Sequence, residues 1–253
     1  MATLARFLHD DEIRFGLVSD GQVTPISGDY FGDREPAGDA IALDAVKLLA
    51  PIVPRQMLAV ALNYKSHLGD RTPPGNPELF WKSPSSLIGP QDVIVMPKDA
   101  ERVDSEGELV VVIGRRCSKV SKEDAMDHVL GYTCGNDVSA RDWQRGDRQW
   151  WRAKSADTFS PMGPWIVEEL EPTELTLVTR YDGEEVQRTQ TNLLIYDIPT
   201  VISFASQVVT LEPGDAIYTG TPGTTRKMED GQTVEVEISQ IGALVNPVVQ
   251  ESE

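Results

Sequence analysis

The chain has 253 residues, which is long enough for one sizeable core or for a main domain with a small appendage. Its formal net charge is −17, so it should repel phosphate backbones, and we expect no nucleic-acid partner. Its two cysteines form no CxxC pair, and no signal region is visible, which favours a cytoplasmic protein. No apolar run approaches the roughly 20 residues of a membrane helix, so we expect no membrane partner.

The first 52 residues predict a small N-terminal α/β module. Residues 4–8 and 13–18 are apolar and flank Asp10 and Asp11, which is typical of a β-hairpin. Residues 40–49 have the spacing of a helix. The segment APIVPR (50–55) carries two prolines and marks a boundary. We therefore expect one module over residues 1–52 and a main domain over residues 53–253.

The main domain is predicted to be rich in short strands. We expect them over residues 57–62, 93–96, 109–113, 165–167, 175–181, 185–189, 216–219 and 234–238. Helical patterns cover residues 122–130, which Ser121 would cap, and residues 198–209. Residues 65–79 contain three prolines and two glycines, which suits an irregular lid. Many strands and few helices indicate a β-rich α+β fold rather than a doubly wound sheet.

The segment DSEGELVVVIG (104–114) places acidic residues directly before one of the most apolar runs of the chain. In an extended strand, residues i and i+2 face the same way, so Glu106 and Glu108 should project together. Two adjacent like charges repel, and a hard divalent cation removes that cost. The alternative is a solvated loop before a strand, and the spacing of this segment alone favours that alternative.

Two further segments carry candidate site residues. In CGNDVSARDWQ (134–144), Asp137 follows an apolar segment and precedes Arg141 and Gln144, which fits either a site at a strand end or a turn. Lys154 lies in an aromatic stretch of the sequence. Its side chain either packs along the rings or offers a fixed positive charge to an anionic substrate.

His67 lies in the 65–79 loop, and Asp70 follows three residues later. A histidine oriented by a carboxylate is the usual general base, whereas a histidine at a helix start with an acid nearby explains the pattern equally well. The segment YTGTPGTT (218–225) lacks the lysine of a phosphate-binding loop. Its glycine-rich turn and the Thr221 hydroxyl could still bind a carboxylate.

Taken in chain order, seven segments resemble the fumarylacetoacetate hydrolase family. They are LNYKSH, LFWKSPSSLIGP, DSEGELVVVIG, GYTCGNDVSARDWQ, KSADTFSPMGPWIV, LEPGDAIYTGTPG and IGALVNPV, and the resemblance covers residues 57–248. The chain length is similar to that of the compact members. The resemblance implies a mixed β-roll, usually dimeric, with one Mg²⁺ or Mn²⁺ in each active site.

The resemblance also implies roles for individual residues. The metal carboxylates of the family fall on Glu106, Glu108 and Asp137. Its substrate-binding positions and its lid histidine fall on Arg141, Gln144, Lys154, Thr221 and His67. Three positions depart from the family pattern: Asp70 stands where a glutamate is usual, Ser105 replaces an aromatic residue, and Gly107 replaces a β-branched or similar residue. The sequence offers no reason for a glycine between two metal ligands, and Asp104 either supports the site or faces solvent.

The activity implied by the resemblance is metal-dependent hydrolysis of a carbon–carbon bond in a 1,3-dioxo or acylpyruvate-type acid, through an enolate. Tautomerisation, isomerisation or decarboxylation of a 2-oxo dicarboxylic acid would pass through the same enolate, and a non-catalytic binding protein is a further alternative. For hydrolysis, we expect His67, oriented by Asp70, to activate water, and Lys154 and Gln144 to stabilise oxyanion charge. The 65–79 lid would exclude bulk water.

Overall fold

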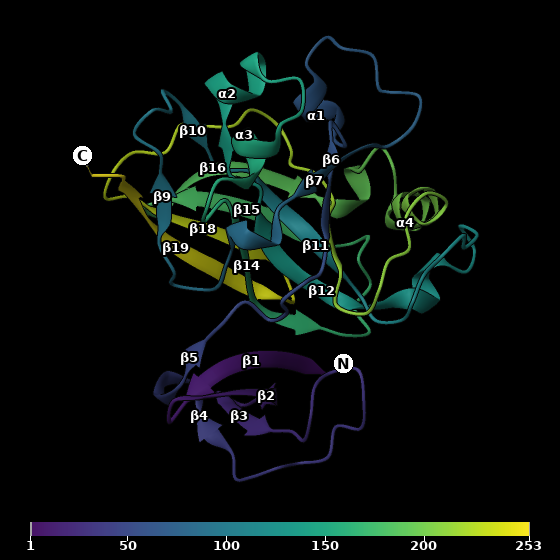
Figure 1. The fold of residues 1–253 in the computed structure, drawn as a ribbon, viewed down its shortest axis with the longest axis vertical. Coiled ribbons are helices and arrows are strands. Elements are labelled where there is room, and N and C mark those ends of the chain that lie inside the picture. Colours follow the sequence, from purple (N-terminus) through teal and green to yellow (C-terminus); the bar gives the residue numbers. More distant parts are fainter. Residues whose placement is uncertain (1, 253) are drawn as a thin grey trace.

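The structure is a computed structural model that describes residues 2–252 (Figure 1). Its strands are β1 (Thr3–His9), β2 (Glu12–Ser19), β3 (Gln22–Pro25), β4 (Ile41–Ala42), β5 (Lys47–Leu48), β6 (Met57–Ala61), β7 (Glu78–Lys82), β8 (Leu87–Ile88), β9 (Ile94–Met96), β10 (Val103–Asp104), β11 (Gly107–Ile113), β12 (Val129–Asn136), β13 (Ser139–Ala140), β14 (Ser160–Val167), β15 (Thr176–Tyr181), β16 (Glu184–Gln190), β17 (Ala216–Tyr218), β18 (Thr233–Ile238) and β19 (Gly242–Gln250). Its α-helices are α1 (Lys65–Leu68), α2 (Arg141–Gly146), α3 (Trp151–Ser155) and α4 (Ile198–Ser206), and its 3-10 helices are η1 (Leu43–Ala45), η2 (Pro84–Ser86), η3 (Ala125–His128) and η4 (Thr191–Leu193). The expected β-rich fold with few helices is confirmed.

The N-terminal residues form the predicted hairpin but not the predicted helix. Asp10 and Asp11 both adopt positive φ, as the tight turn between β1 and β2 requires. The helix expected over residues 40–49 is wrong, because β4 pairs with β3 and β5 pairs with β1, which leaves only one 3-10 turn between them. Sheet pairing overrides the helical spacing here, so this module is built from strands rather than being α/β.

One long sheet runs through the molecule in the order β4-β3-β2-β1-β14-β12-β11-β17-β6-β7. The N-terminal strands join it through β1, which pairs antiparallel with β14 at Thr3↔Val167 and Leu4↔Ile166. A second sheet, in the order β16-β15-β18-β19-β9, packs across the main sheet near β11 and β12 (Figure 1). The site described below lies where loops from both sheets meet α1, α2 and α3.

Strand β11 is buried on both faces, which explains the continuous apolar run from Leu109 to Ile113. Leu109, Val111 and Ile113 belong to a core shared with the second sheet and α4. Val110 and Val112 point the opposite way, into a core shared with the N-terminal module. A strand packed on both sides is held rigidly, so the residues at its start have fixed positions.

The two predicted helices have different outcomes. Helix α4 forms as expected, and the Asp197 carboxylate caps it by accepting a hydrogen bond from the Thr200 backbone N–H at 3.0 Å. The helix expected over residues 122–130 is wrong, because only the 3-10 turn η3 forms before the chain enters β12 at Val129. None of the helices in the described residues 2–252 is long and apolar enough to cross a membrane.

Candidate metal centre and substrate cavity

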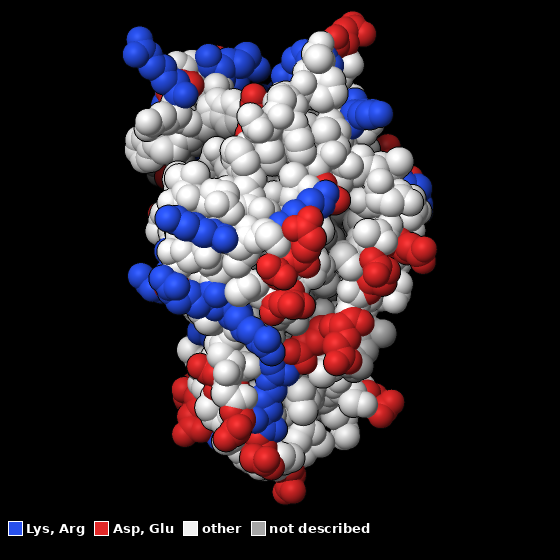
Figure 2. Space-filling model, turned by 90° about the vertical axis from the view of Figure 1, so that its right-hand side faces the viewer, with Lys and Arg blue, Asp and Glu red and all other residues white. Residues whose placement is uncertain are grey.

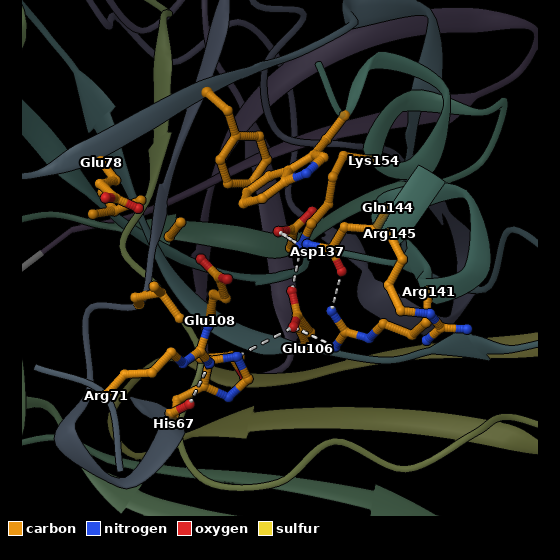
Figure 3. Close-up of a pocket in the computed structure, with 16 residues that line it drawn as sticks. His67, Arg71, Glu78, Glu106, Glu108, Asp137, Arg141, Gln144, Arg145 and Lys154 are labelled. Carbon is orange, nitrogen blue, oxygen red and sulfur yellow. Dashed lines mark hydrogen bonds and ion pairs between the residues drawn. The ribbon is translucent and has the colours of Figure 1, made fainter. Parts of the chain in front are cut away.

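A cavity of about 440 Å³ opens between β6, β7, the start of β11, and helices α1 to α3 (Figure 3). It is lined by Val60, Ala61, Leu62, His67, Arg71, Glu78, Phe80, Glu106, Glu108, Asp137, Arg141, Gln144, Arg145, Trp150, Lys154 and Thr221. Every predicted site residue except Asp70 therefore lines one cavity. The remaining question is how these side chains are held.

Three buried carboxylates meet at the floor of this cavity. Glu108 lies on β11, Glu106 directly precedes that strand, and Asp137 directly follows β12. Because Gly107 and Asn136 are paired across the two strands, the three side chains converge, and one oxygen from each lies within 4.8 Å of the others. The Asp137 backbone N–H donates to the Glu106 carbonyl at 2.9 Å, which fixes the turn after β12.

Buried cations hold two of these carboxylates. Lys154 Nζ lies 2.5 Å from both Glu106 Oε2 and Asp137 Oδ2. Lys82 Nζ lies 2.5 Å from Asp137 Oδ1, and its side chain is completely buried. Arg141 Nη2 donates to Glu106 Oε1 at 2.5 Å. Glu106 and Asp137 are thus oriented by three basic side chains, of which Lys154 and Arg141 have raised pKa values because burial is outweighed by the charges of the carboxylates, whereas burial lowers the pKa of Lys82.

Glu108 is held differently. Its carboxylate accepts a hydrogen bond from the Gly220 backbone N–H, at 2.6 Å. Burial raises the pKa of Glu108 well above its usual value, and the charges of Asp137 and Glu106 raise it further. For Glu106, burial also raises the pKa, but Lys154, Arg141 and His67 outweigh this and bring it well below its usual value. Glu108 is therefore the acid of the centre whose charged form the side chains of the protein compensate least.

This donor set fits a hard divalent cation. Mg²⁺ and Mn²⁺ prefer carboxylate oxygens, and a cation beside Glu108 would offset the burial and the repulsion that raise its pKa. Glu106, Glu108 and Asp137 would hold the cation, as the sequence predicts.

Asp104 supports the centre from behind and does not face solvent. Its buried carboxylate accepts two hydrogen bonds from Arg102, one from Arg141 Nε at 2.9 Å, and one from the Thr225 hydroxyl at 2.6 Å. Arg141 in turn contacts Glu106. Asp104 therefore fixes the guanidinium that fixes a metal carboxylate.

Close packing explains Gly107, for which the sequence offers no reason. A Cβ atom at this position would lie 2.2 Å from Thr179 Oγ1 and 3.3 Å from Val236 Cγ1. Strands β15 and β18 of the second sheet therefore press directly on the backbone between the two metal glutamates. Glycine is therefore required here because a side chain would not fit, and not because of an unusual backbone angle, since the φ angle of Gly107 is not positive.

His67 lies on α1 and faces the cavity, but the carboxylate expected to orient it does not do so. The His67 Nδ1 atom lies 2.6 Å from the Gly223 carbonyl oxygen, so Nδ1 carries the donated proton and Nε2 is free to accept one. Nε2 lies 3.9 Å from Glu106 Oε1. Asp70 is exposed, and no hydrogen bond or ion pair recorded among the described residues joins it to His67. The backbone of the 218–225 segment takes the place predicted for Asp70.

The remaining predicted residues divide into donors that face the cavity and residues that position them. The Gln144 carbonyl accepts from Arg141 Nη1 at 2.9 Å, which leaves the Gln144 amide N–H groups to donate. Thr221 Oγ1 accepts from Gln187 Nε2 at 3.1 Å, which leaves its O–H to donate. Arg141 spends its hydrogen bonds on Asp104, Glu106, Gln144 and Thr225, so in this structure it acts as a positioning residue.

Sequence reasoning missed Lys82, Gln187 and the Gly223 carbonyl. Lys82 stands in one of the segments that carry the family resemblance, LFWKSPSSLIGP, and this is the signal that could have identified it. Gln187 links two parts of the site, because its carbonyl accepts from the Gly107 N–H while its amide donates to Thr221. The aromatic neighbour of the Lys154 ammonium is Phe80 of β7, at 5.1 Å from its ring centroid.

Comparison with known proteins agrees with this geometry. Residues 56–249 match the family described as fumarylacetoacetate (FAA) hydrolase C-terminal, and residues 3–51 match the one described as Rv2993c-like, N-terminal. The chain belongs to the fumarylacetoacetate hydrolase family. Members of this family are enzymes, so the alternative of a non-catalytic binding protein falls away.

Three relatives of this family show the range of its reactions. Oxaloacetate tautomerase fahd2, mitochondrial, from Xenopus laevis is 42% identical over 219 residues, which cover 81% of this chain and 69% of that protein. The crystal structure of 2-hydroxyhepta-2,4-diene-1,7-dioate isomerase from Mycobacterium marinum matches with a TM-score of 0.94 and 40% identity, over all of both chains. Maleylpyruvate hydrolase from Sphingobium sp. SYK-6, in complex with manganese (II) ion and pyruvate, matches with a TM-score of 0.84 and 32% identity, over 99% of this chain and 100% of that one.

Proposed function

We propose that this protein is a divalent-metal-dependent isomerase that interconverts the keto and enol forms of a 2-oxo or 2,4-dioxo acid. The observation that carries the proposal is one cavity in which three buried carboxylates face His67 and three side-chain donors. The carboxylates fit a divalent cation, the donors fit an anionic substrate, and the histidine can move a proton. When bound there, the cation would supply positive charge beside the oxo and carboxylate oxygens of the substrate.

The residues of the chain supply the remaining chemistry. Lys154 Nζ has three N–H groups and gives two to Glu106 and Asp137, so one remains for an oxygen that gains negative charge. The Gln144 amide and the Thr221 hydroxyl can bind the substrate carboxylate. His67 Nε2, with Nδ1 held by the Gly223 carbonyl, can take a proton from the carbon beside the oxo group and deliver it to the oxo oxygen, which gives the enol; the reverse transfer restores the keto form.

Two observations favour isomerisation over the hydrolysis expected from the sequence. The tautomerase and isomerase relatives are 42% and 40% identical to this chain, whereas the maleylpyruvate hydrolase is 32% identical. In addition, His67 is held by a neutral carbonyl and not by a carboxylate. The usual arrangement for a histidine that activates water has a carboxylate that accepts from its ring N–H, and here the Gly223 carbonyl takes that place.

Hydrolysis of the bond between C3 and C4 of an acylpyruvate is the second candidate. The hydrolase relative, which binds manganese and pyruvate, favours it. In that reaction, water adds to the distal carbonyl, the carbon–carbon bond breaks, and the products are pyruvate and a carboxylic acid. Both candidates need the same enolate, so the same residues would serve either.

Product analysis separates the two reactions. The protein is incubated with Mg²⁺ or Mn²⁺ and the enol form of 2,4-dioxopentanoate or oxaloacetate, freshly dissolved so that it starts away from keto–enol equilibrium, while the absorbance of the enol is followed against a control with metal alone and pyruvate is assayed with lactate dehydrogenase. Loss of absorbance without stoichiometric pyruvate supports isomerisation, and stoichiometric pyruvate supports hydrolysis. No metal-dependent change with 2,4-dioxo acids or oxaloacetate would contradict both. Full activity in excess EDTA would contradict the metal requirement.

A variant of the proposed base tests the role of His67. We expect His67→Gln to lower kcat by about 100-fold, the lower end of what a general base contributes. Lys65→Gln, an exposed substitution on the same short helix, is the matched control and should keep kcat close to the parent value. Equal rates in His67→Gln and parent protein would remove His67 from the mechanism.

The expected dimer and the substrate partner also remain proposals. We propose that the chain assembles as a homodimer around a small 2-oxo or dioxo acid site, as the family resemblance implies. Light scattering coupled to size-exclusion chromatography measures the mass directly, and a monomeric mass at working concentration would contradict the dimer.

A further inference from the structure

A second cavity of about 430 Å³ adjoins the substrate cavity. It is lined by Ala61, Glu78, Leu79, Phe80, Trp81, Arg148, Gln149, Trp150 and Trp151. Four of these residues, Ala61, Glu78, Phe80 and Trp150, also line the first cavity. The two spaces therefore share a wall, and a molecule seated in the first could extend into the second.

Two aromatic rings, those of Phe80 and Trp150, form part of the shared wall. The Lys154 ammonium lies 5.1 Å from the centroid of the Phe80 ring, on the side of the carboxylate centre. The Phe80 ring lies 5.5 Å from the Trp150 ring in an edge-to-face arrangement with an interplanar angle of 73°. Trp150 and its neighbour Trp151 line the second cavity, so aromatic side chains extend from beside Lys154 into that cavity.

The second cavity differs from the first in its chemistry. The first is lined by acids, arginines, a lysine and a histidine, whereas only Glu78 and Arg148 are charged in the second. Trp81 and Trp151 remain 51% and 70% exposed there, although both indoles are large and apolar. Exposed aromatic side chains that gather at one hollow next to a catalytic cavity are typical of a ligand-binding surface.

We propose that this cavity is a subsite for the acyl arm of the substrate and that it takes an aryl or similarly extended apolar group. The proposal rests on the proposed function, since the first cavity would hold the 2-oxo acid head beside the carboxylates. The arm lies along Phe80 and Trp150 and stacks on Trp151. The preferred substrates are then 2,4-dioxo acids with a ring system at the far end, and not short acids alone.

A series of 2,4-dioxo acids with methyl, phenyl or naphthyl end groups tests this specificity. The measured quantity is the ratio of kcat/KM for the naphthyl acid to that for the methyl acid. We expect Trp151→Ala to lower this ratio about tenfold, because one aromatic contact with its buried area contributes on this scale. Trp151→Phe should restore much of it. Phe31→Ala, at an exposed aromatic residue that lines neither cavity, is the matched control and should leave the ratio unchanged.

A binding measurement keeps this test independent of turnover. Calorimetric titration of the naphthyl acid into His67→Gln and into His67→Gln/Trp151→Ala, both with Mn²⁺, should show about tenfold weaker binding in the double variant. Such a difference without turnover in the parent protein supports the subsite and contradicts the proposed reaction. Turnover with equal ratios in Trp151→Ala and parent protein supports the reaction and overturns the subsite.

Discussion

At the scale of single residues, Glu108 is the acid in the centre that most needs a cation. It is buried with a raised pKa, and Gly220 offers it only a neutral N–H group. We expect Glu108→Gln to abolish Mn²⁺ binding in calorimetric titration, while the metal-free protein keeps or gains thermal stability, because burial and the neighbouring carboxylates disfavour the charged form of Glu108 and glutamine is neutral.

The control for Glu108→Gln is Glu78→Gln, at a carboxylate in the same cavity but outside the triad. We expect this variant to bind Mn²⁺ like the parent protein. Unchanged Mn²⁺ affinity in Glu108→Gln, or equal losses in the two variants, would contradict the assignment of the metal ligands.

Gly107 leads to a prediction about packing at the same centre. Adding a methyl group in Gly107→Ala brings it against Thr179 Oγ1, so we expect a loss of about 1–3 kcal/mol in the free energy of unfolding. Thr179→Ala removes the obstructing hydroxyl, which has no hydrogen-bond partner among the residues that the structure describes. The double variant should therefore be more stable than Gly107→Ala alone. Urea unfolding of the four proteins measures this coupling, and strictly additive losses would refute the packing explanation.

The candidate site was predictable from the sequence where motifs carry it and not where distant segments meet. The acids Glu106, Glu108 and Asp137 follow from the family motifs, and the structure brings them together. The Gly223 carbonyl that holds His67 comes from 156 residues away, so no local pattern could show that it takes the place expected of Asp70. Residues that make contacts of this kind are invisible until the fold is known.

At the scale of elements, the prediction of strands succeeded where apolar runs are long. The prediction of helices failed where a segment can instead pair with the edge of a neighbouring strand. Strand β11 is buried on both faces, and its uninterrupted apolar sequence shows this directly. Residues 40–49 have helical spacing, yet their neighbours β1 and β3 offer edges with which they pair. Tertiary pairing therefore decided the outcome for this short segment, which is too short to be a stable helix alone.

The cap of α4 is testable by itself. The Asp197 carboxylate accepts from the Thr200 N–H and pairs with Lys122. We expect Asp197→Ala to lower the free energy of unfolding by about 1 kcal/mol, and Asp197→Asn to keep most of it, because asparagine also caps. Burial raises the pKa of Asp197, but Lys122 and Thr200 lower it more, so the net shift is downward.

The sign of that shift fixes the pH dependence of the cap. A lowered folded-state pKa means that the contribution of the carboxylate is complete above the unfolded pKa and is lost as the pH falls through the folded pKa. The difference in the free energy of unfolding between the parent protein and Asp197→Ala should therefore become smaller in acid. Chemical unfolding of both proteins at neutral and acidic pH measures it, and a difference that grows in acid would contradict the capping role.

At the scale of the whole molecule, the net charge of −17 is not spread evenly. Figure 2 shows one face on which Asp and Glu side chains gather in clusters beside a band of Lys and Arg side chains. Inside the cavity the balance differs, because Arg71, Arg141, Arg145 and Lys154 line it together with the carboxylates. An anionic substrate therefore meets positive groups at the site although the protein as a whole is acidic.

The N-terminal module and the main domain share a hydrophobic core as well as a β-sheet, so they form one folded unit. Leu4, Ile26, Tyr30 and Ile52 of this module are buried in one cluster with residues of β6, β11, β14 and β17. Strand β1 also covers the edge of β14. The boundary predicted at residue 52 therefore separates two segments of sequence that share one core.

Removing residues 1–52 should destabilise the remainder of the chain. The shortened protein, residues 53–253, exposes the edge of β14 and the apolar side chains that Leu4 and Tyr30 cover, so we expect it to unfold at a lower temperature and to aggregate. Leu4→Ala in the full chain is the milder comparison and should cost about 2–5 kcal/mol, since Leu4 is completely buried. Thermal unfolding and light scattering check both proteins. A shortened chain that stays monomeric and unfolds at the parent temperature would show that the catalytic part folds alone and that the shared core adds nothing to its stability.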